Sequence, residues 1–526
     1  MTSDNPTPES SPLETPPVRT ATASSTIWRK ERITRRGIIG GAGVAAGAAA
    51  IGASALGQAL DRNGSGKPGS DSAAALGQPA AATPQAGTSS GSSALVTSMR
   101  VPLTGVAADQ VPALLQGAVT DWRAVGCPIP LPVSVVAIDG LAPDGAAPKE
   151  TVADYAALVA ALDKTPGAVA SVPLDLIDAR VNTLEVDGVN PLLATATDAE
   201  PVIRIGVAGD IIFGRNGGNY QRKYGDYTFP MLEVKDFLST FDVTIANFEC
   251  FVSDTIEPPE LTDGATLDFV TPPDSLEGLV MAGIDAVSLA NNHALYSNAG
   301  YGVEAFYDTV RHLTDAGIPS FGAGRDLDEA RAPWVTEVNG LSIALYGVDG
   351  VTANTDFPGD WAVPVNVGAT ASGAGTNPMV LDTIVADVTA LAGEHDIVIP
   401  FFHMGEQYLW TPRDWVVQVS RACIDAGATM MLSSHPHTIM GMEIYKDKPI
   451  FYSIGNFVYD QMFSVDTRTG TFLDLTVRGN RVVGIRVHGV EIVDFVQPRF
   501  MSAGEHASLM NRYWRSTDLR VREQGA

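Results

Sequence analysis

One run of sequence decides the fold of this chain: Asp285-Ala286-Val287-Ser288-Leu289-Ala290-Asn291-Asn292-His293. The run is apolar until it stops at two amides and an imidazole, so it predicts a buried strand that delivers polar side chains to its own end. In an open α/β sheet, ligand sites form beyond the carboxyl ends of the strands. Taken by itself, the run also fits a turn in which an asparagine tolerates left-handed backbone and His293 caps a neighbouring group.

Four other apolar runs end in the same way. The polar residues that follow them are Asp210, Asn247 with Glu249, His403, and His435 with His437. Four of the chain's eight histidines therefore lie at predicted strand ends. Carboxylate, amide and imidazole groups together suit Mn, Fe or Zn better than Ca, which takes oxygen ligands. The pattern predicts a metal site in which Glu249 can bridge two ions. An extended backbone around Pro436 would place His435 and His437 on one side.

The order of the runs indicates a layered α/β domain over residues 199–500. Strand-like runs alternate with helical stretches at 302–316 and 415–426, and residues 470–493 alternate as a β hairpin does. The predicted strands are 203–207, 243–246, 286–289, 342–346, 397–402, 429–432 and 450–453. Residues 501–526 form a C-terminal tail without a usable motif.

The N-terminal hundred residues differ in composition from the rest of the chain. Residues 1–60 combine a Pro- and Ser-rich segment with Arg35-Arg36 and a charge-free Gly/Ala-rich run, which resembles a twin-arginine export signal. A membrane anchor is the competing interpretation, because the run is long enough to span a bilayer. Residues 61–94 have the composition of a flexible linker. We therefore expect export across the cytoplasmic membrane, to an extracellular or membrane-tethered place in the cell envelope.

Residues 95–198 regain globular composition. The stretch Gly117-Ala118-Val119-Thr120-Asp121-Trp122 resembles part of a phosphate-type periplasmic binding protein. Only one lobe's length of sequence is present, and no Ser/Thr/Gly loop suits an oxyanion. The segment is interpreted as a small α/β lobe used for packing or docking, with a solute site as the weaker alternative.

Charge and cysteine content exclude several classes of protein. The formal net charge is −26, which argues against a nucleic-acid partner because phosphate binding needs a basic surface. The three cysteines, Cys127, Cys250 and Cys423, are scattered and show no disulfide or zinc-finger spacing. A membrane contact is expected only through an uncleaved N-terminal signal.

The motifs in their order resemble the CapA family of capsule and poly-γ-glutamate synthesis proteins, within the calcineurin-like metallophosphoesterase superfamily. They are Gly209-Asp210, Asn247-Phe248-Glu249, Asn291-Asn292-His293, His403-Met404-Gly405, His435-Pro436-His437 and Ser453-Ile454-Gly455-Asn456-Phe457-Val458. The resemblance covers residues 202–465. It implies an α/β sandwich with a metal site at the carboxyl ends of its strands, preceded here by the binding-protein-like lobe.

The resemblance also implies roles for individual residues. Two divalent ions, Mn, Fe or Zn, would be held by two sets of ligands that Glu249 bridges. One set is Asp210 with His437, and the other is Asn292 with His403 and His435. His293 would act as general acid or orient the leaving group. Arg215 would contact an anionic group of the substrate, unless it only forms a salt bridge within the protein.

Departures from the superfamily pattern leave two functions open. Ile212 stands where a ligand histidine is usual, and Met404 and Gln407 replace a tryptophan and a glutamate of the family. The first hypothesis is an exported metal-dependent hydrolase or transferase acting on an anionic cell-envelope polymer. The second is a non-catalytic accessory subunit that binds such a polymer or its synthase complex.

Overall fold

The computed structural model describes residues 93–193, 200–258, 267–297, 299–354, 356–357 and 366–524. The expected signal or anchor and residues 61–92 of the expected linker lie outside these residues, whereas residues 93 and 94 begin strand β1 (Ser93–Ser98). In the described part of the chain, no helix combines the length and the apolar character needed to cross a membrane.

Residues 93–193 form the predicted small α/β lobe. Its sheet has the strand order β4 (Glu150–Val152), β3 (Ser134–Ile138), β5 (Ala168–Pro173), β1 (Ser93–Ser98) and β6 (Val181–Thr183), with helices α2 (Val111–Leu115) and α3 (Tyr155–Lys164). Trp122 is buried and donates its indole N–H to the carbonyl of Gly167 at 2.8 Å. Asp121 accepts the backbone N–H of Arg123 at 2.9 Å and so begins a short 3₁₀ helix. Both residues of the motif thus have structural tasks, which agrees with a packing role for the lobe.

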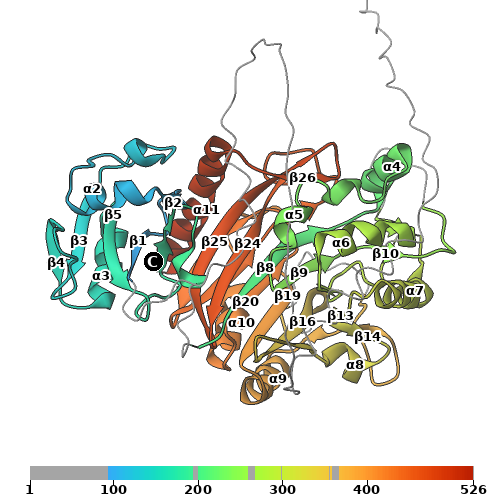
Figure 1. Cartoon of the computed structure of the whole chain (residues 1–526). Coiled ribbons are helices and arrows are strands. Elements are labelled where there is room, and N and C mark those ends of the chain that lie inside the picture. Colours follow the sequence, from blue (N-terminus) through green and yellow to red (C-terminus); the bar gives the residue numbers. More distant parts are fainter. Residues whose placement is uncertain are drawn as a thin grey trace, which may run out of the picture. The chain divides into compact units, whose positions relative to one another are not determined.

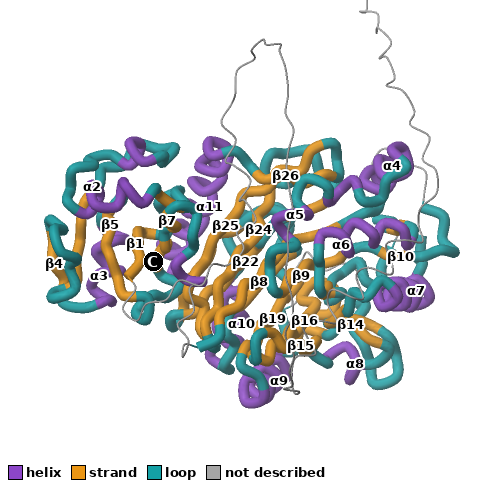
Figure 2. The backbone as a smooth tube through the Cα atoms, in the orientation of Figure 1, coloured by secondary structure: helices purple, strands orange, loops and turns teal. Residues whose placement is uncertain are grey.

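Two mixed sheets form the larger domain (Figures 1 and 2). The first has the order β13 (Ser320–Phe321), β12 (Ala286–Ser288), β9 (Val243–Phe248), β8 (Val202–Ile211), β24 (Thr469–Arg478), β25 (Arg481–Val493) and β26 (Gln497–Phe500), and β23 (Asn456–Val458) also pairs with β8. The second has the order β15 (Trp334–Val338), β16 (Leu341–Asn354), β19 (Ile397–His403), β20 (Met431–Ser434), β22 (Lys448–Ser453) and β21 (Met440–Tyr445), and β18 (Pro378–Met379) pairs with β16. Short pairs are β2 (Gly105–Val106) with β7 (Glu185–Val186), β10 (Phe251–Val252) with β11 (Val270–Thr271), and β14 (Ala323–Gly324) with β17 (Gly375–Thr376).

The alternation of side chains along the strands builds an α/β sandwich. Ile205 of β8 and Ile343 of β16 belong to one apolar cluster between the sheets, whereas the next residue of β16, Ala344, belongs to another with helical residues. The helices are α4 (Arg215–Tyr224), α5 (Lys235–Leu238), α6 (Leu276–Ala282), α7 (Gly302–Asp315), α8 (Leu327–Arg331), α9 (Leu381–Glu394), α10 (Asp414–Asp425) and α11 (Ala503–Gln524). Residues of α6 and α7 pack with β9 and β12, and residues of α9 and α10 pack with β16 and β19. The fold class predicted from the sequence is confirmed.

The structure extends some predicted elements and corrects one region. β16 continues to Asn354, and β20 begins two residues later than expected and ends at Ser434. The hairpin expected at residues 470–493 is β24 with β25. Residues 503–524 of the supposed tail are helix α11, which contacts β21 and buries Leu509 and Tyr513. The three cysteines are buried and unpaired.

Candidate metal centre

The strand ends of both sheets deliver their polar side chains to one place. β8 supplies Asp210 near its end, β19 ends at His403, and the segments after β9, β12 and β20 supply the others. These side chains are all buried: Asp210, Glu249, Asn292, His293, His403, His435 and His437. Strand β12 ends at Ser288, and the polar end of the opening run forms the turn that follows it, with neither Asn291 nor Asn292 at positive φ.

Three of the predicted ligand atoms converge around one point. The Nε2 atom of His403 lies 2.8 Å from Oδ1 of Asn292 and 3.1 Å from Nδ1 of His435. These three residues come from the ends of three different strands, in both sheets. An amide oxygen beside two imidazole nitrogens is a ligand set that suits Zn, Fe or Mn.

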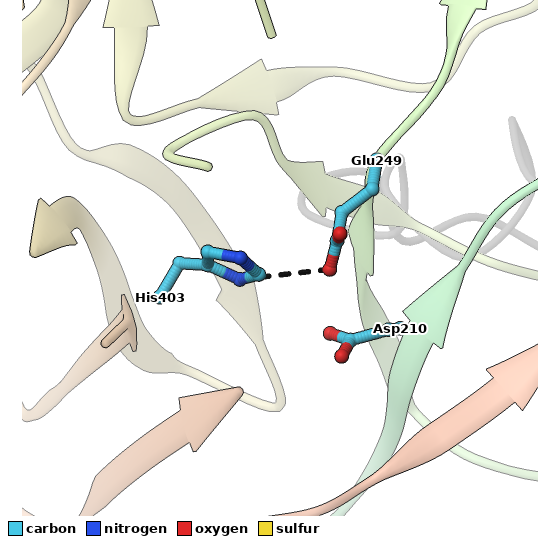
Figure 3. Close-up of side chains that lie close together, drawn as sticks. All are labelled: Asp210, Glu249 and His403. Carbon is cyan, nitrogen blue, oxygen red and sulfur yellow. Dashed lines mark ion pairs between the residues drawn. The ribbon is translucent and has the colours of Figure 1, made fainter. Parts of the chain in front are cut away.

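The second predicted group lies beside the first. Nδ1 of His437 is 3.1 Å from Oδ2 of Asp210. Nδ1 of His403 is 3.6 Å from Oε1 of Glu249, and Figure 3 shows this imidazole with the carboxylates of Glu249 and Asp210 nearby. Ligand atoms of Asp210, Glu249 and His403 all lie within 4.8 Å of one another. Glu249 is thus placed between the two groups, as a bridging carboxylate must be.

Two buried carboxylate oxygens test whether these residues fit metal ions. Within the described residues, neither Oδ2 of Asp210 nor Oε2 of Glu249 accepts a hydrogen bond. A buried charged oxygen without a donor is costly, since nothing replaces its lost hydration. Divalent cations would supply the missing partner, so the donor set fits them.

Burial also sets the protonation of the site. It lowers the pKa of His435 to about 3 and, together with the charge of His435, lowers the pKa of His403 well below its ordinary value. Both imidazoles are therefore neutral near pH 7 and keep a lone pair for a metal. Burial, with the charge of Asp210, raises the pKa of Glu249. Burial would also raise the pKa of Asp210, but the nearby imidazole of His437 and the charge of His403 together outweigh it and lower this pKa.

The backbone between His435 and His437 is not extended, contrary to expectation. Both residues have positive φ, 101° and 56°. Such angles are strained for residues with a side chain and persist where the surroundings fix them, often at functional sites. The turn brings the two rings within 5.8 Å of each other and aims them at different groups of ligands.

Two amides at the site were not among the predicted functional residues. Nδ2 of Asn247 donates to Oδ1 of Asp210 at 2.8 Å and to Oε1 of Glu249 at 2.6 Å, so this side chain orients both carboxylates. Oδ1 of Asn456 lies 2.9 Å from Nδ1 of His437. Asn247 could have been found, since it lies two residues before Glu249 and follows the same run. Asn456 lies in the motif Ser453–Val458, but its role depends on contacts between segments that are distant in sequence.

Arg215 and His293 line a cavity of about 350 Å³ next to the site. Nε of Arg215 donates to both carboxylate oxygens of Asp460, at 3.0 and 3.2 Å, so the alternative of an internal salt bridge applies at least in part. The guanidinium also lies 5.1 Å from the ring of Phe269 and 5.2 Å from that of Tyr459. His293 packs edge-on against Phe269, with ring centroids 4.4 Å apart. Burial, followed by the charges of His403 and His437, lowers the pKa of His293.

Ile212 places an apolar side chain where the superfamily pattern has a ligand histidine. Its side chain is buried in the apolar cluster that also contains Phe213 and Phe457. It offers no ligand atom, so the group around Asp210 and His437 lacks the histidine that the superfamily pattern places there.

The arrangement is that of an α/β sandwich with a candidate metal centre at its strand ends. The family described as bacterial capsule synthesis protein PGA_cap matches residues 204–461, which contain every predicted ligand. Residues 204–461 of this chain therefore form a domain that matches the PGA_cap family.

Individual proteins are also similar to parts of this chain. The capsule biosynthesis protein CapA of Bacillus anthracis is 28% identical over 48% of this chain and 59% of its own length. A probable polyglutamine synthesis accessory protein of Mycobacterium tuberculosis is 29% identical over 45% of this chain and 60% of its own length. The chain thus spans about three fifths of each of these relatives. A solved phosphatase structure from Mycoplasma pneumoniae aligns over 56% of this chain and 94% of its own, with 15% identity and a TM-score of 0.33.

Proposed function

We propose that this chain is a metal-dependent hydrolase or transferase that acts on a cell-envelope polymer during capsule or poly-γ-glutamate synthesis or processing. The observation that carries the proposal is the convergence of Asn292, His403 and His435 beside two buried carboxylate oxygens that accept no hydrogen bond from the described residues. Buried polar atoms normally have hydrogen-bond partners, so these two oxygens call for an explanation, and bound cations would supply one.

The residues divide into two ligand sets. Asp210 and His437 would hold one ion, and Asn292, His403 and His435 the other, with Glu249 between them. When bound, such ions supply Lewis acidity and a water whose pKa falls to about 7. Asn247 holds the carboxylates of Asp210 and Glu249 in place through one amide group.

The remaining polar groups face the substrate. His293 lines the cavity, and its Nδ1 has no hydrogen-bond partner among the described residues. This nitrogen can hold a hydrogen bond to the leaving group as the scissile bond breaks. Arg215, oriented by Asp460, places positive charge in the cavity wall, where it favours a substrate with an acidic group.

A second function is an accessory subunit that binds the polymer or its synthase complex without chemistry. Ile212 favours it, because one ligand set is short of a histidine. The name of the mycobacterial relative also describes an accessory protein. The ion held by Asp210 and His437 would then be bound weakly or serve only a structural role.

Metal content and turnover of the full chain separate the two functions. We expect two Mn, Fe or Zn ions per chain by mass spectrometry, and cleavage of phosphodiester or γ-glutamyl substrates that a chelator abolishes and added metal restores. His437→Ala should lose one ion and turnover. His395→Ala is the matched control, since His395 hydrogen-bonds Ser342 outside the site and should keep both. Bound metal without turnover on any substrate would favour the accessory subunit.

Export is a separate part of the proposal and rests on the pair Arg35-Arg36. We expect the wild-type chain to appear outside the cytoplasmic membrane and the double variant Arg35→Lys, Arg36→Lys to accumulate inside. Equal distribution of the two proteins after cell fractionation would rule out a twin-arginine signal.

A further inference from the structure

We infer that Asn456 is a ligand of the ion held by Asp210 and His437, and that its side-chain oxygen replaces the histidine which Ile212 cannot supply. The inference rests on the proposed metal site but not on hydrolysis. It assigns a divalent cation to three residues on neighbouring segments of the first sheet and of the turn after β20.

The sheet itself places Asn456 beside Asp210. β23 pairs in parallel with β8, and in this register Asn456 lies opposite Asp210. The backbone N–H of Asp210 donates to the carbonyl of Gly455 at 3.1 Å. The two strands approach so closely that a Cβ atom on Gly209 would lie 1.8 Å from this carbonyl oxygen. The positions of the two side chains are therefore fixed by backbone contacts.

The hydrogen bonds of the amide fix which of its atoms faces the site. Nδ2 of Asn456 donates to the carbonyl of Thr467 at 2.7 Å and approaches Oε1 of Gln461 at 3.5 Å. Since the NH₂ group is used by these acceptors, the oxygen must point the other way. There Oδ1 lies 2.9 Å from Nδ1 of His437, which is 3.1 Å from Oδ2 of Asp210. Asn456 is fully buried, so its oxygen has no access to bulk water.

The three atoms form an oxygen–nitrogen–oxygen set in which Nδ1 of His437 lies close to both oxygens. One of them, Oδ2 of Asp210, belongs to a carboxylate and accepts no hydrogen bond from the described residues. A carboxylate, an imidazole and an amide oxygen are ligands of the same types as those of the neighbouring set, in which Asn292 supplies the amide. The site would then contain two ions of similar ligation, joined by Glu249.

The position of Ile212 explains why the compensating ligand comes from β23. The backbone N–H of Ile212 donates to the carbonyl of Val458 at 2.8 Å, so the chain after β8 runs along β23. The side chain of Ile212 is turned into the apolar cluster with Phe457. β23 is one of the strands paired with β8, and its register places the polar side chain of Asn456 opposite Asp210.

Variants at Asn456 test the inference through metal binding, in the full chain and with Mn²⁺ as the probe. We expect Asn456→Leu to bind one ion per chain, or to bind the second ion with an affinity lower by about 10- to 100-fold. Asn456→Asp, which keeps an oxygen at this place, should retain two ions. Asn182→Leu in the lobe is the control, because Asn182 also donates its amide to a backbone carbonyl, that of Leu103, and should leave both ions in place.

The position of the bound ion shows whether Asn456 is a metal ligand or only positions His437. In crystals soaked with Mn²⁺, anomalous scattering should place Oδ1 of Asn456 at about 2.2 Å from one ion, as expected for coordinating oxygen. Oδ1 more than about 3 Å from both ions would show that Asn456 only orients His437, and would overturn the inference. The inference would also be overturned if Asn456→Leu bound both ions with the dissociation constants of the wild type, or if the wild-type chain bound no metal. If the wild-type chain binds metal but shows no turnover, the proposed hydrolase activity is contradicted, whereas the assignment of Asn456 as a ligand stands.

Discussion

At the scale of single residues, Asn292 and His293 are neighbours with different tasks. Asn292 contacts His403 within a ligand set, whereas His293 faces the cavity. We expect Asn292→Ala to weaken metal binding, and His293→Ala to keep the metal and slow turnover by about 10²-fold, the lower range for a lost proton donor. Metal analysis and turnover on the same samples check both. Equal loss of metal in the two variants would contradict this division of roles.

Gly209 is a residue at which the fold allows no side chain. An added Cβ would lie 1.8 Å from the carbonyl oxygen of Gly455, which is backbone and cannot swing away. We expect Gly209→Ala to lower the free energy of unfolding by about 3 kcal/mol or more, within the range of severe steric substitutions. Urea denaturation measures this change.

The matched glycine is Gly393 in α9, where an added Cβ meets nothing within 4 Å. Gly393→Ala should raise the free energy of unfolding by about 0.5 to 1 kcal/mol, because alanine favours helix. If both variants destabilise the protein equally, the close approach at Gly209 is not the cause.

At the scale of elements, the sequence predicted more of the site than of its surroundings. A buried run that stops at a polar residue is visible in sequence, and this is why Asp210, His403 and His435 could be placed together. β23 is only three residues long, so Asn456 gave no such signal. The partner of Arg215 could not be predicted either, since Asp460 lies 245 residues further along the chain. Both contacts are made by folding distant segments together.

Helix α11 shows the opposite case, an element that the sequence could have predicted. Leu509 and Tyr513 are buried four residues apart, and Met510 lies on the same side. Charged residues in the rest of the helix, such as Glu505 and Arg515, hide this apolar face in the sequence. One of its contacts predicts a pH dependence: the backbone N–H of Gly489 in β25 donates to Nδ1 of His506 at 3.3 Å. The accepting nitrogen must be unprotonated.

Burial, with the nearby charge of His488, lowers the pKa of His506 to about 4. Between pH 6.5 and about 4 the unfolded chain binds a proton at His506 that the folded chain does not, so stability falls as the pH falls through this window. His506→Gln, which removes the titration, should show a smaller loss of melting temperature between pH 7 and 4.5 than the wild type. An identical loss in both proteins would contradict the assignment to His506.

At the scale of the whole molecule, the described lobe and sandwich make contacts that suit a packing role for the lobe. The described residues all belong to one compact unit. Val483 of β25 belongs to the same apolar cluster as Leu162 and Val172 of the lobe. Arg486 of β25 forms an ion pair with Glu185, and also donates to the carbonyl of Thr183 at 3.3 Å. The two parts should therefore unfold together.

A double-mutant cycle between Arg486 and Glu185 tests this coupling. Both side chains are largely buried, with 16% and 24% exposure, so their pairing is screened less than a surface salt bridge. We expect a coupling free energy of about 1 kcal/mol from urea denaturation of the single and double alanine variants. Arg486→Ala should also separate the unfolding of the lobe from that of the sandwich in calorimetry, while both metal ions stay bound, because the metal centre has no ligand in the lobe. Zero coupling with an unchanged single transition would show that the apolar contact at Val483, and not the ion pair, holds the lobe to β25.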